Sequence, residues 1–229
     1  MNIDSFMLSY PPLICTDYGE AEFASIRTLC PGLSSPKLGK ILNFAGRFLY
    51  PGEIYLEIGT FTGYTLIAAS HHNSRCEFWG IDNMRLLGEK TTQDKQDWVR
   101  NRLKTNLDHF KYGNHKFIEA DYKNVTLPAD KKIGVFLIDG HHTKEEVLEN
   151  FTWAHGKLAD EALIAIDDIT QWGVGEGVDA WVQDHQDEYK EFFRMNVYHP
   201  PHEIDHWSPA FWNGLSLVSF KKKAVAHVS

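Results

Sequence analysis

Acidic side chains follow apolar, strand-like segments of the chain at the point where each segment ends. Residues 136–138 lead into Asp139, and residues 163–166 lead into the pair Asp167 and Asp168. Because the carboxyl ends of parallel strands share one edge of a sheet, we expect these three carboxylates to meet there. Carboxylate oxygens suit Mg²⁺ or another hard divalent ion, whereas zinc more typically recruits histidine or cysteine. The pattern predicts a magnesium-type site, and the adjacent histidines leave zinc or a transition ion open.

Each part of this pattern also has an ordinary structural explanation. Asp139 followed by Gly140 is a turn sequence, and adjacent aspartates can cap the segment that follows them. The combination nevertheless favours a metal, because three carboxylates at one sheet edge repel one another unless a cation or a proton offsets their charge.

Two histidines, His141 and His142, come directly after these turn residues. An imidazole that titrates near physiological pH is the usual side chain for taking a proton from a hydroxyl, so either histidine is a candidate general base. The structural alternative is a histidine at the start of the helix expected from Thr143, and the chain contains 12 histidines.

The run from Glu57 to Thr65 is expected to lie where a buried strand turns into a helix. Gly59 allows a tight turn and close approach of a ligand, and Gly63 opens the helix. NAD sites use Gly-x-Gly-x-x-Gly at such a turn, whereas this chain has Glu-x-Gly-x-x-x-Gly. Because a carboxylate would repel a pyrophosphate but suits a cation or a hydroxylated ligand, we expect an S-adenosylmethionine-type cofactor. An ordinary strand-turn-helix with a surface glutamate is the alternative.

Two more aspartates end strand-like segments further along the chain. Asp82 ends the next strand after Gly59, where an acidic side chain can accept hydrogen bonds from both ribose hydroxyls of an adenosine-bearing ligand. NAD enzymes use the same device, so this residue does not separate the cofactors. Asp121 ends the following segment and is a weaker candidate. An aspartate that merely ends a strand before a turn is the alternative.

Strand and helix patterns alternate along most of the chain, which predicts a parallel sheet. Strands are expected at 53–58, 77–81, 116–119, 133–138, 162–166, 192–198 and 215–220, and helices at 20–30, 36–49, 64–68, 91–110, 143–155 and 178–188. Prolines between the last two strands break the rhythm and favour an antiparallel last strand. The predicted class is α/β, a Rossmann-like seven-stranded sheet with an antiparallel last strand and helices on both faces. Residues 1–50 are expected to form an N-terminal helical cap on the sheet edge or over the cofactor.

The glycine-rich run Gly173–Gly177 is similar to a phosphate-binding loop. It follows the fifth strand, contains Glu176 and lacks a following Lys-Ser/Thr, so a flexible connection near the substrate mouth is expected instead.

Composition limits the class of protein. At 229 residues with no internal repeat or linker, the chain is expected to be a single domain over residues 1–229. The net charge of −8, with a basic run only at Lys221–Lys223, argues against a nucleic-acid partner. Three widely spaced cysteines indicate no disulfide framework, and no segment reaches the roughly 18 apolar residues of a membrane helix, so a cytoplasmic protein with no membrane partner is expected.

These motifs resemble the class I S-adenosylmethionine-dependent O-methyltransferases, above all the metal-dependent catechol and macrolide-sugar enzymes, over roughly residues 38–220. The stretch from Glu57 to Thr65 is similar to the family's first motif. The resemblance implies that Asp82 contacts the ribose and Ala120–Asp121 the adenine. The cofactor-binding set implied in this way is Glu57, Gly59, Thr60, Gly63, Thr65, Asp82, Ala120, Asp121 and Asp139.

The same resemblance implies that Asp139, Asp167 and Asp168 bind the metal. Catechol enzymes have Asp-Asn where this chain has Asp167–Asp168, and the sugar-modifying branch has Asp-Asp. The position of the catechol enzymes' basic lysine is His142 here, as in the macrolide-sugar enzymes, so His142 is the preferred base and His141 the reserve. The implied reaction is in-line displacement: a hydroxyl of a small molecule loses its proton and attacks the methyl group of the sulfonium.

The sequence leaves the acceptor open between a phenol or catechol and a sugar. Candidate walls are residues 84–98 and the aromatic loop 199–212, whose aromatic residues fit core or dimer packing equally well. A homodimer is possible. The competing hypotheses are an NAD-dependent or nucleotide-sugar oxidoreductase, disfavoured by the absent Gly-x-Gly-x-x-Gly, and an inactive S-adenosylmethionine-binding module that serves a partner.

Overall fold

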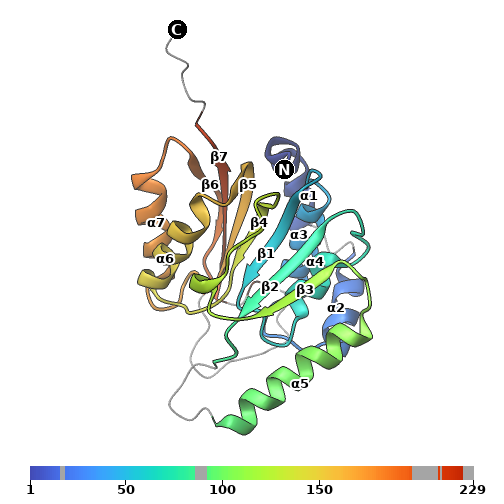
Figure 1. The fold of residues 1–229 in the computed structure, drawn as a ribbon. Helices are drawn as coiled ribbons and strands as arrows, with labels where there is room; N and C mark the ends of the chain where they lie inside the picture. The colour runs from blue at the N-terminus through green and yellow to red at the C-terminus, as the bar shows by residue number, and fades with distance from the viewer. Residues whose placement is uncertain (16–18, 86–91, 198–210, 212, 224–229) are drawn as a thin grey trace.

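Seven strands form one mixed sheet in the computed structural model of the protein, which describes residues 1–15, 19–85, 92–197, 211 and 213–223 (Figure 1). The strands are β1 (Glu53–Ile58), β2 (Glu77–Asp82), β3 (His115–Glu119), β4 (Lys132–Ile138), β5 (Leu158–Asp167), β6 (Tyr189–Met195) and β7 (Leu215–Lys221), in the spatial order β3-β2-β1-β4-β5-β7-β6. Only β7 is antiparallel to its neighbours, β5 and β6. The predicted seven-stranded sheet with its last strand reversed is therefore confirmed.

Helices cover both faces of this sheet, as predicted. They are α1 (Ile3–Cys15), α2 (Glu20–Leu29), α3 (Pro36–Gly46), α4 (Tyr64–Ser70), α5 (Gln93–His109), α6 (Lys144–His155) and α7 (Val174–Asp184), with a 3-10 turn η1 (Tyr122–Asn124). Helices α6 and α7 lie on one face, and α1, α3 and α4 lie on the other (Figure 1).

The alternation of β1 assigns its side chains to these two layers. Ile54 and Leu56 belong to the core cluster that contains Phe151 of α6, whereas Tyr55 packs in the cluster on the opposite face. Glu57 lies on the same face as Tyr55, because side chains two apart in a strand point the same way. The motif's carboxylate thus starts on the face covered by α3 and α4.

Side-chain caps begin two of the predicted helices where the sequence places them. Ser35 Oγ accepts a hydrogen bond of 3.1 Å from Leu38 N at the start of α3, and Thr143 Oγ1 accepts one of 3.2 Å from Glu146 N at the start of α6. Both caps satisfy an N–H group that the first helical turn leaves without a partner.

Helix α1 was not predicted as a separate element of the 1–50 cap. Its buried side chains Ile3, Phe6 and Tyr10 recur at helical spacing and pack against the sheet. The helix nevertheless continues through Pro11–Pro12, residues that argue against a helix in the sequence. Packing of the apolar stripe outweighs that local signal.

The glycine-rich run after β5 is helical, so the prediction of a flexible connection there was wrong. Gly173 caps α7 with φ of 88°, and α7 begins at Val174, four residues before the predicted start. A Cβ at Gly175 would lie 2.8 Å from the Ile169 carbonyl oxygen, and one at Gly177 would lie 3.0 Å from that of Lys144. These glycines let α7 pack closely against its neighbours.

Strand β6 also begins three residues before its predicted start. Buried Tyr189 opens the strand opposite Phe220 of β7, and this pairing decides the boundary. Most of the proposed aromatic wall 199–212 lies outside the described residues. Phe211 is described and is 1% exposed, with its ring centroid 6.3 Å from that of Phe193, so this aromatic residue belongs to the core.

Within the described part of the chain, no helix combines the length and apolarity needed to cross a membrane.

The turn after β1 approaches the end of β4 very closely. Gly59 has φ of 94° and donates a hydrogen bond of 2.9 Å from its N–H to the Ile81 carbonyl oxygen, while Asp139 N donates one of 3.0 Å to the Ile58 carbonyl oxygen. A Cβ at Gly59 would overlap the Asp139 carbonyl oxygen and lie 2.9 Å from Gly140 N. Both backbone conformation and space therefore require glycine.

We expect Gly59→Ala to lower the free energy of unfolding by more than about 3 kcal/mol, because left-handed strain adds to a backbone overlap. Gly113→Ala is the matched control: its φ is 77°, but its Cβ would meet nothing within 4 Å. That variant should lose only about 1–2 kcal/mol. Urea unfolding measures both, and equal losses would contradict the close-approach argument.

Candidate active site

A cavity of about 800 Å³ opens at the carboxyl ends of β1, β2, β4 and β5. This volume suits a small-molecule ligand, and the position is where open α/β sheets bind theirs. The predicted site residues that line it are Gly59, Thr60, Thr65, Asp82, Ala120, Asp121, Asp139, His141, His142, Asp167 and Asp168. The structure therefore brings eleven of the predicted residues to one cavity.

Glu57 and Gly63 were also predicted to bind the cofactor, but neither lines the cavity. Gly63 is the left-handed N-cap of α4, where a Cβ would come within 2.7 Å of Leu103 Cδ1. Glu57 is fully buried and accepts a hydrogen bond of 2.6 Å from the Tyr55 hydroxyl. Both residues therefore belong to the packing around the turn after β1 and do not contact the cavity.

Burial raises the pKa of Glu57 to about 7, and the hydrogen bond from Tyr55 opposes that shift. Among the described residues, neither its second carboxyl oxygen, Oε1, nor the buried hydroxyl of Thr60 has a partner at hydrogen-bond geometry, although the hydroxyls of Thr60 and Thr65 also lower the pKa of Glu57. Such unpaired polar atoms are costly in a protein interior. The buried carboxyl group of Glu57 therefore lowers the stability of the folded protein next to the Gly59 turn.

Asp82 joins the turn after β1 to the end of β2. Its carboxylate accepts hydrogen bonds from Phe61 N at 2.8 Å and from Met84 N at 2.7 Å. Each carboxylate oxygen has two acceptor sites, so one on each oxygen remains for hydroxyl groups. Phe61 and Met84 both adopt left-handed backbone conformations, with φ of 48° and 57°. The carboxylate thus holds two strained turns at the cavity wall.

The predicted adenine contacts have clear local roles. Ala120 N donates a hydrogen bond of 3.0 Å to the Asp82 carbonyl oxygen, which extends the pairing of β2 and β3. Asp121 Oδ1 accepts one of 3.0 Å from Lys123 N and caps η1. Asp121 therefore fits the turn role that the sequence left as its alternative, while still lining the cavity.

Three carboxylates, here called the aspartate cluster, gather opposite this wall: Asp139, Asp167 and Asp168. Ser34 Oγ lies 3.4 Å from Asp139 Oδ2 and 3.4 Å from Asp167 Oδ2. Burial raises the pKa of all three carboxyl groups, and repulsion from neighbouring carboxylates raises those of Asp139 and Asp167 further. A cation at this position would relieve that repulsion.

His142 is paired with this cluster through Asp168. His142 Nε2 lies 3.2 Å from Asp168 Oδ2, and Asn213 Nδ2 donates a hydrogen bond of 2.8 Å to Asp168 Oδ1. Burial lowers the pKa of His142, and the Asp168 carboxylate opposes this. His141 also lines the cavity but is exposed. The geometry therefore distinguishes two histidines that the sequence left as alternatives.

The donor set of the cluster fits a divalent cation. One ligand atom each from Asp139, His142 and Asp168 lies within 4.8 Å of the others, and Ser34 links Asp167 to the same group. Oxygen-rich sites of this kind suit hard cations, while the imidazole admits a transition ion.

Sequence reasoning missed Ser34 and Asn213. Ser34 precedes α3 and lines the cavity, where it contacts carboxylates more than 100 residues away in the chain. Asn213–Gly214 is a turn signal, which could have indicated a backbone reversal but not the contact with Asp168.

A family model described as a methyltransferase domain matches residues 56–169. This segment runs from the motif in β1 to the residue after the Asp167–Asp168 pair. No curated protein matches the sequence.

Solved structures share the fold across 80% to 96% of this chain. The O-methyltransferase TomG from Streptomyces achromogenes, in complex with SAM, is 15% identical, with 96% of each chain covered and a TM-score of 0.60. The O-methyltransferase from Bacillus cereus, in complex with SAH, is 14% identical, with 96% of this chain and 97% of that chain covered and a TM-score of 0.56. An rRNA methylase from Streptococcus thermophilus is 12% identical, with 80% and 94% covered and a TM-score of 0.50. At these identities the likeness establishes the fold.

We expect Glu57→Gln to stabilise the ligand-free protein at neutral and alkaline pH. Because the pKa of Glu57 is about 7 in the folded chain and its ordinary value is 4.5, stability is lost as pH rises through this window. The glutamine amide at position 57 does not titrate, so it removes this pH-dependent loss in the free energy of unfolding, which is about 3 kcal/mol at most. Urea unfolding of both proteins at about pH 5 and about pH 8 measures it. An equal difference at both pH values would contradict the assignment.

Proposed function

We propose that this chain methylates a hydroxyl of a small molecule. The premise is the match of residues 56–169 to the methyltransferase family. The methyl donor is S-adenosylmethionine, and a divalent cation, Mg²⁺ in the first instance, assists. The observation that carries the proposal is the shared cavity of the Gly59 turn, the aspartate cluster and His142.

The donor would lie on the β1 and β2 side of the cavity. Gly59 lines the cavity at the turn after β1, and Asp82 retains acceptor sites for the ribose hydroxyls. Thr60 of the same turn and Thr65 of α4 line the cavity, and so do Ala120 and Asp121. Asp139 reaches the cavity between this turn and the remaining acids.

The acceptor hydroxyl would lie between the aspartate cluster and His142. Asp139, Asp167 and Asp168 would hold the cation, whose charge lowers the pKa of a nearby hydroxyl. His142 would take the proton of the acceptor hydroxyl, and the bound donor would supply the methyl group, whose transfer to that oxygen would leave S-adenosylhomocysteine and a methyl ether. Asp168 beside the imidazole stabilises the charge that His142 gains.

Two features favour a small-molecule acceptor over a nucleic acid. The chain carries a net charge of −8, which would repel the negatively charged phosphodiester backbone of a nucleic acid. Trp172 is 70% exposed, and its ring centroid lies 6.2 Å from that of His142. An exposed indole beside the proposed base can stack on a phenol ring or a sugar face.

We expect S-adenosylmethionine to bind in the presence of a chelator, because the Gly59 turn and Asp82 would hold the donor without using the carboxylates of the aspartate cluster. Methyl transfer to an acceptor should fall to background in chelator and return with Mg²⁺. Calorimetry and a labelled-methyl assay over catechols, flavonoids and aminoglycoside or macrolide sugars measure the two effects. Absence of donor binding would contradict the whole proposal, whereas activity indifferent to chelator would remove only the cation.

We expect His142→Gln to lower kcat by about 10²–10⁴ without changing donor affinity, as loss of a general base does. His141→Gln is the matched control, since this neighbouring histidine is exposed and has no ion pair with Asp168 among the contacts of the described residues. Single-turnover kinetics with the acceptor found in the screen separate the variants. A larger loss in His141→Gln would reverse the assignment.

A further inference from the structure

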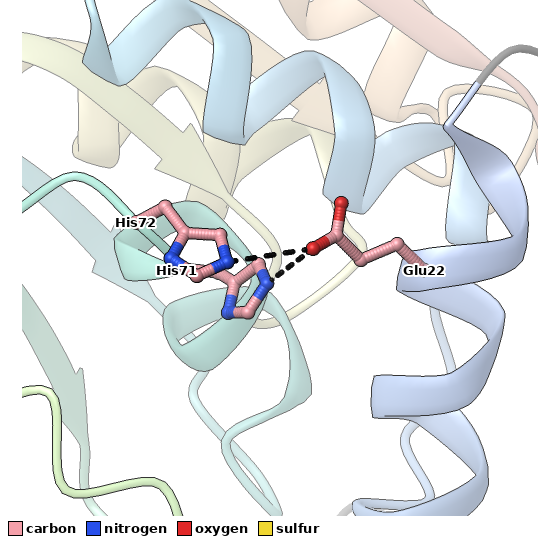
Figure 2. Close-up of side chains that lie close together, drawn as sticks. All are labelled: Glu22, His71 and His72. Atoms are coloured by element: carbon pink, nitrogen blue, oxygen red, sulfur yellow. Dashed lines mark hydrogen bonds and ion pairs between the residues drawn. The ribbon is translucent and has the colours of Figure 1, made fainter.

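A second group of metal-ligating side chains lies away from the cavity, between α2 and the end of α4. Glu22 of α2 faces His71 and His72, which follow the last residue of α4 (Figure 2). His71 Nε2 lies 2.7 Å and His72 Nε2 lies 3.6 Å from the same oxygen, Glu22 Oε1. One ligand atom from each residue lies within 4.8 Å of the others.

The backbone of His72 is held in a left-handed conformation, with φ of 58°. Among the described residues, the other non-glycine residues with positive φ are Phe61, Met84, Asp168, Trp172 and Asn213; all but Trp172 line the cavity, and Trp172 lies beside His142. A left-handed residue often follows a helix C-cap, but glycine is the usual choice there. The side chain of His72 is 74% exposed, so burial does not account for the histidine.

The second ring nitrogen of His71 is held by Tyr112. Its Nδ1 lies 2.6 Å from the Tyr112 hydroxyl, a group that can either donate or accept. With the hydroxyl donating to Nδ1, the Nε2–H of His71 points at Glu22. With the hydroxyl accepting from Nδ1–H, the lone pair of Nε2 is free for a metal. A change of His71 tautomer, with the ring proton on Nδ1 and the Tyr112 hydroxyl turned to accept it, therefore converts a hydrogen-bonding histidine into an oriented ligand, the arrangement that supports metal-bound histidines.

We propose that Glu22, His71 and His72 form a surface site for a transition-metal ion of the Zn²⁺ class. Two imidazoles and one carboxylate are ligands typical of zinc, with a further position left for water. This chemistry differs from that of the carboxylate-rich aspartate cluster, which suits a harder ion. The site is independent of the proposed methyl transfer.

A bound ion would join the N-terminal cap to the helix that opens at Gly63. Glu22 lies on α2, whose following residue Cys30 directs its Sγ to the Thr62 carbonyl oxygen at 3.4 Å. Thr62 Oγ1 donates a hydrogen bond of 2.5 Å to the Pro31 carbonyl oxygen. The ion would thus tie down one end of the segment whose other end reaches the cavity at Ser34.

Calorimetric titration of the full chain with Zn²⁺ tests this site. Asp139→Asn serves as the background, because it weakens competing binding at the aspartate cluster. In that background we expect one ion bound with micromolar affinity, and about a tenfold or greater loss on adding His72→Gly or Glu22→Gln, since even an outer-shell partner is worth that much. Glycine at position 72 keeps the left-handed backbone without strain.

His109→Ala in the same background is the matched control, because His109 is an exposed histidine outside the group. The affinity of this variant for Zn²⁺ should equal that of the background protein. A thermal melt with and without Zn²⁺ gives a second readout: the ion should raise the Tm of the background protein but not that of the His72→Gly protein. No Zn²⁺ binding in the background, or equal affinity after His72→Gly, overturns the proposal.

Discussion

The close approach of two strand ends, β1 at Gly59 and β4 at Asp139, is the constraint on which the site depends. Gly59 leaves no room for a side chain against the Asp139 backbone, and the strands are tied there by the hydrogen bond from Asp139 N to the Ile58 carbonyl oxygen. The same turn is linked to β2 through Ile81 and Asp82. A ligand turn and an acidic strand end thereby become parts of one wall, and neither can move without the other.

Several buried carboxyl groups lie close together around this contact between β1 and β4, which is unfavourable for stability. Burial raises the pKa of Glu57 and of the whole aspartate cluster, and mutual repulsion adds to it within the cluster. Among the described residues, every non-glycine residue with positive φ except His72 lines the cavity at this edge of the sheet or, for Trp172, lies beside His142. A cavity that retains repulsion, unpaired polar atoms and backbone strain is organised for ligands rather than for stability. The surrounding layers of aliphatic and aromatic side chains hold it in place.

Much of the fold follows from local signals. Apolar, strand-like segments located every strand of the sheet, and Ser35 and Thr143 marked helix starts that the structure confirms through their capping hydrogen bonds. Errors arose where packing outweighed those signals. Helix α1 passes through Pro11–Pro12 because its apolar stripe is buried, and α7 starts within a glycine run because only glycine fits against Ile169 and Lys144. The family match over residues 56–169 supports a methyltransferase over the oxidoreductase alternative.

Local sequence patterns specify the order of the strands and of every α-helix except α1, together with the Gly59 turn and the acids at the strand ends, because each depends on neighbours within a few residues. Which of these groups face the cavity follows from tertiary packing. Glu57 and Gly63 lie beneath it, His142 rather than His141 pairs with Asp168, and Ser34 and Asn213 enter from distant segments. Such contacts join residues far apart in the chain, so they depend on how layers pack and loops close, which no local pattern specifies.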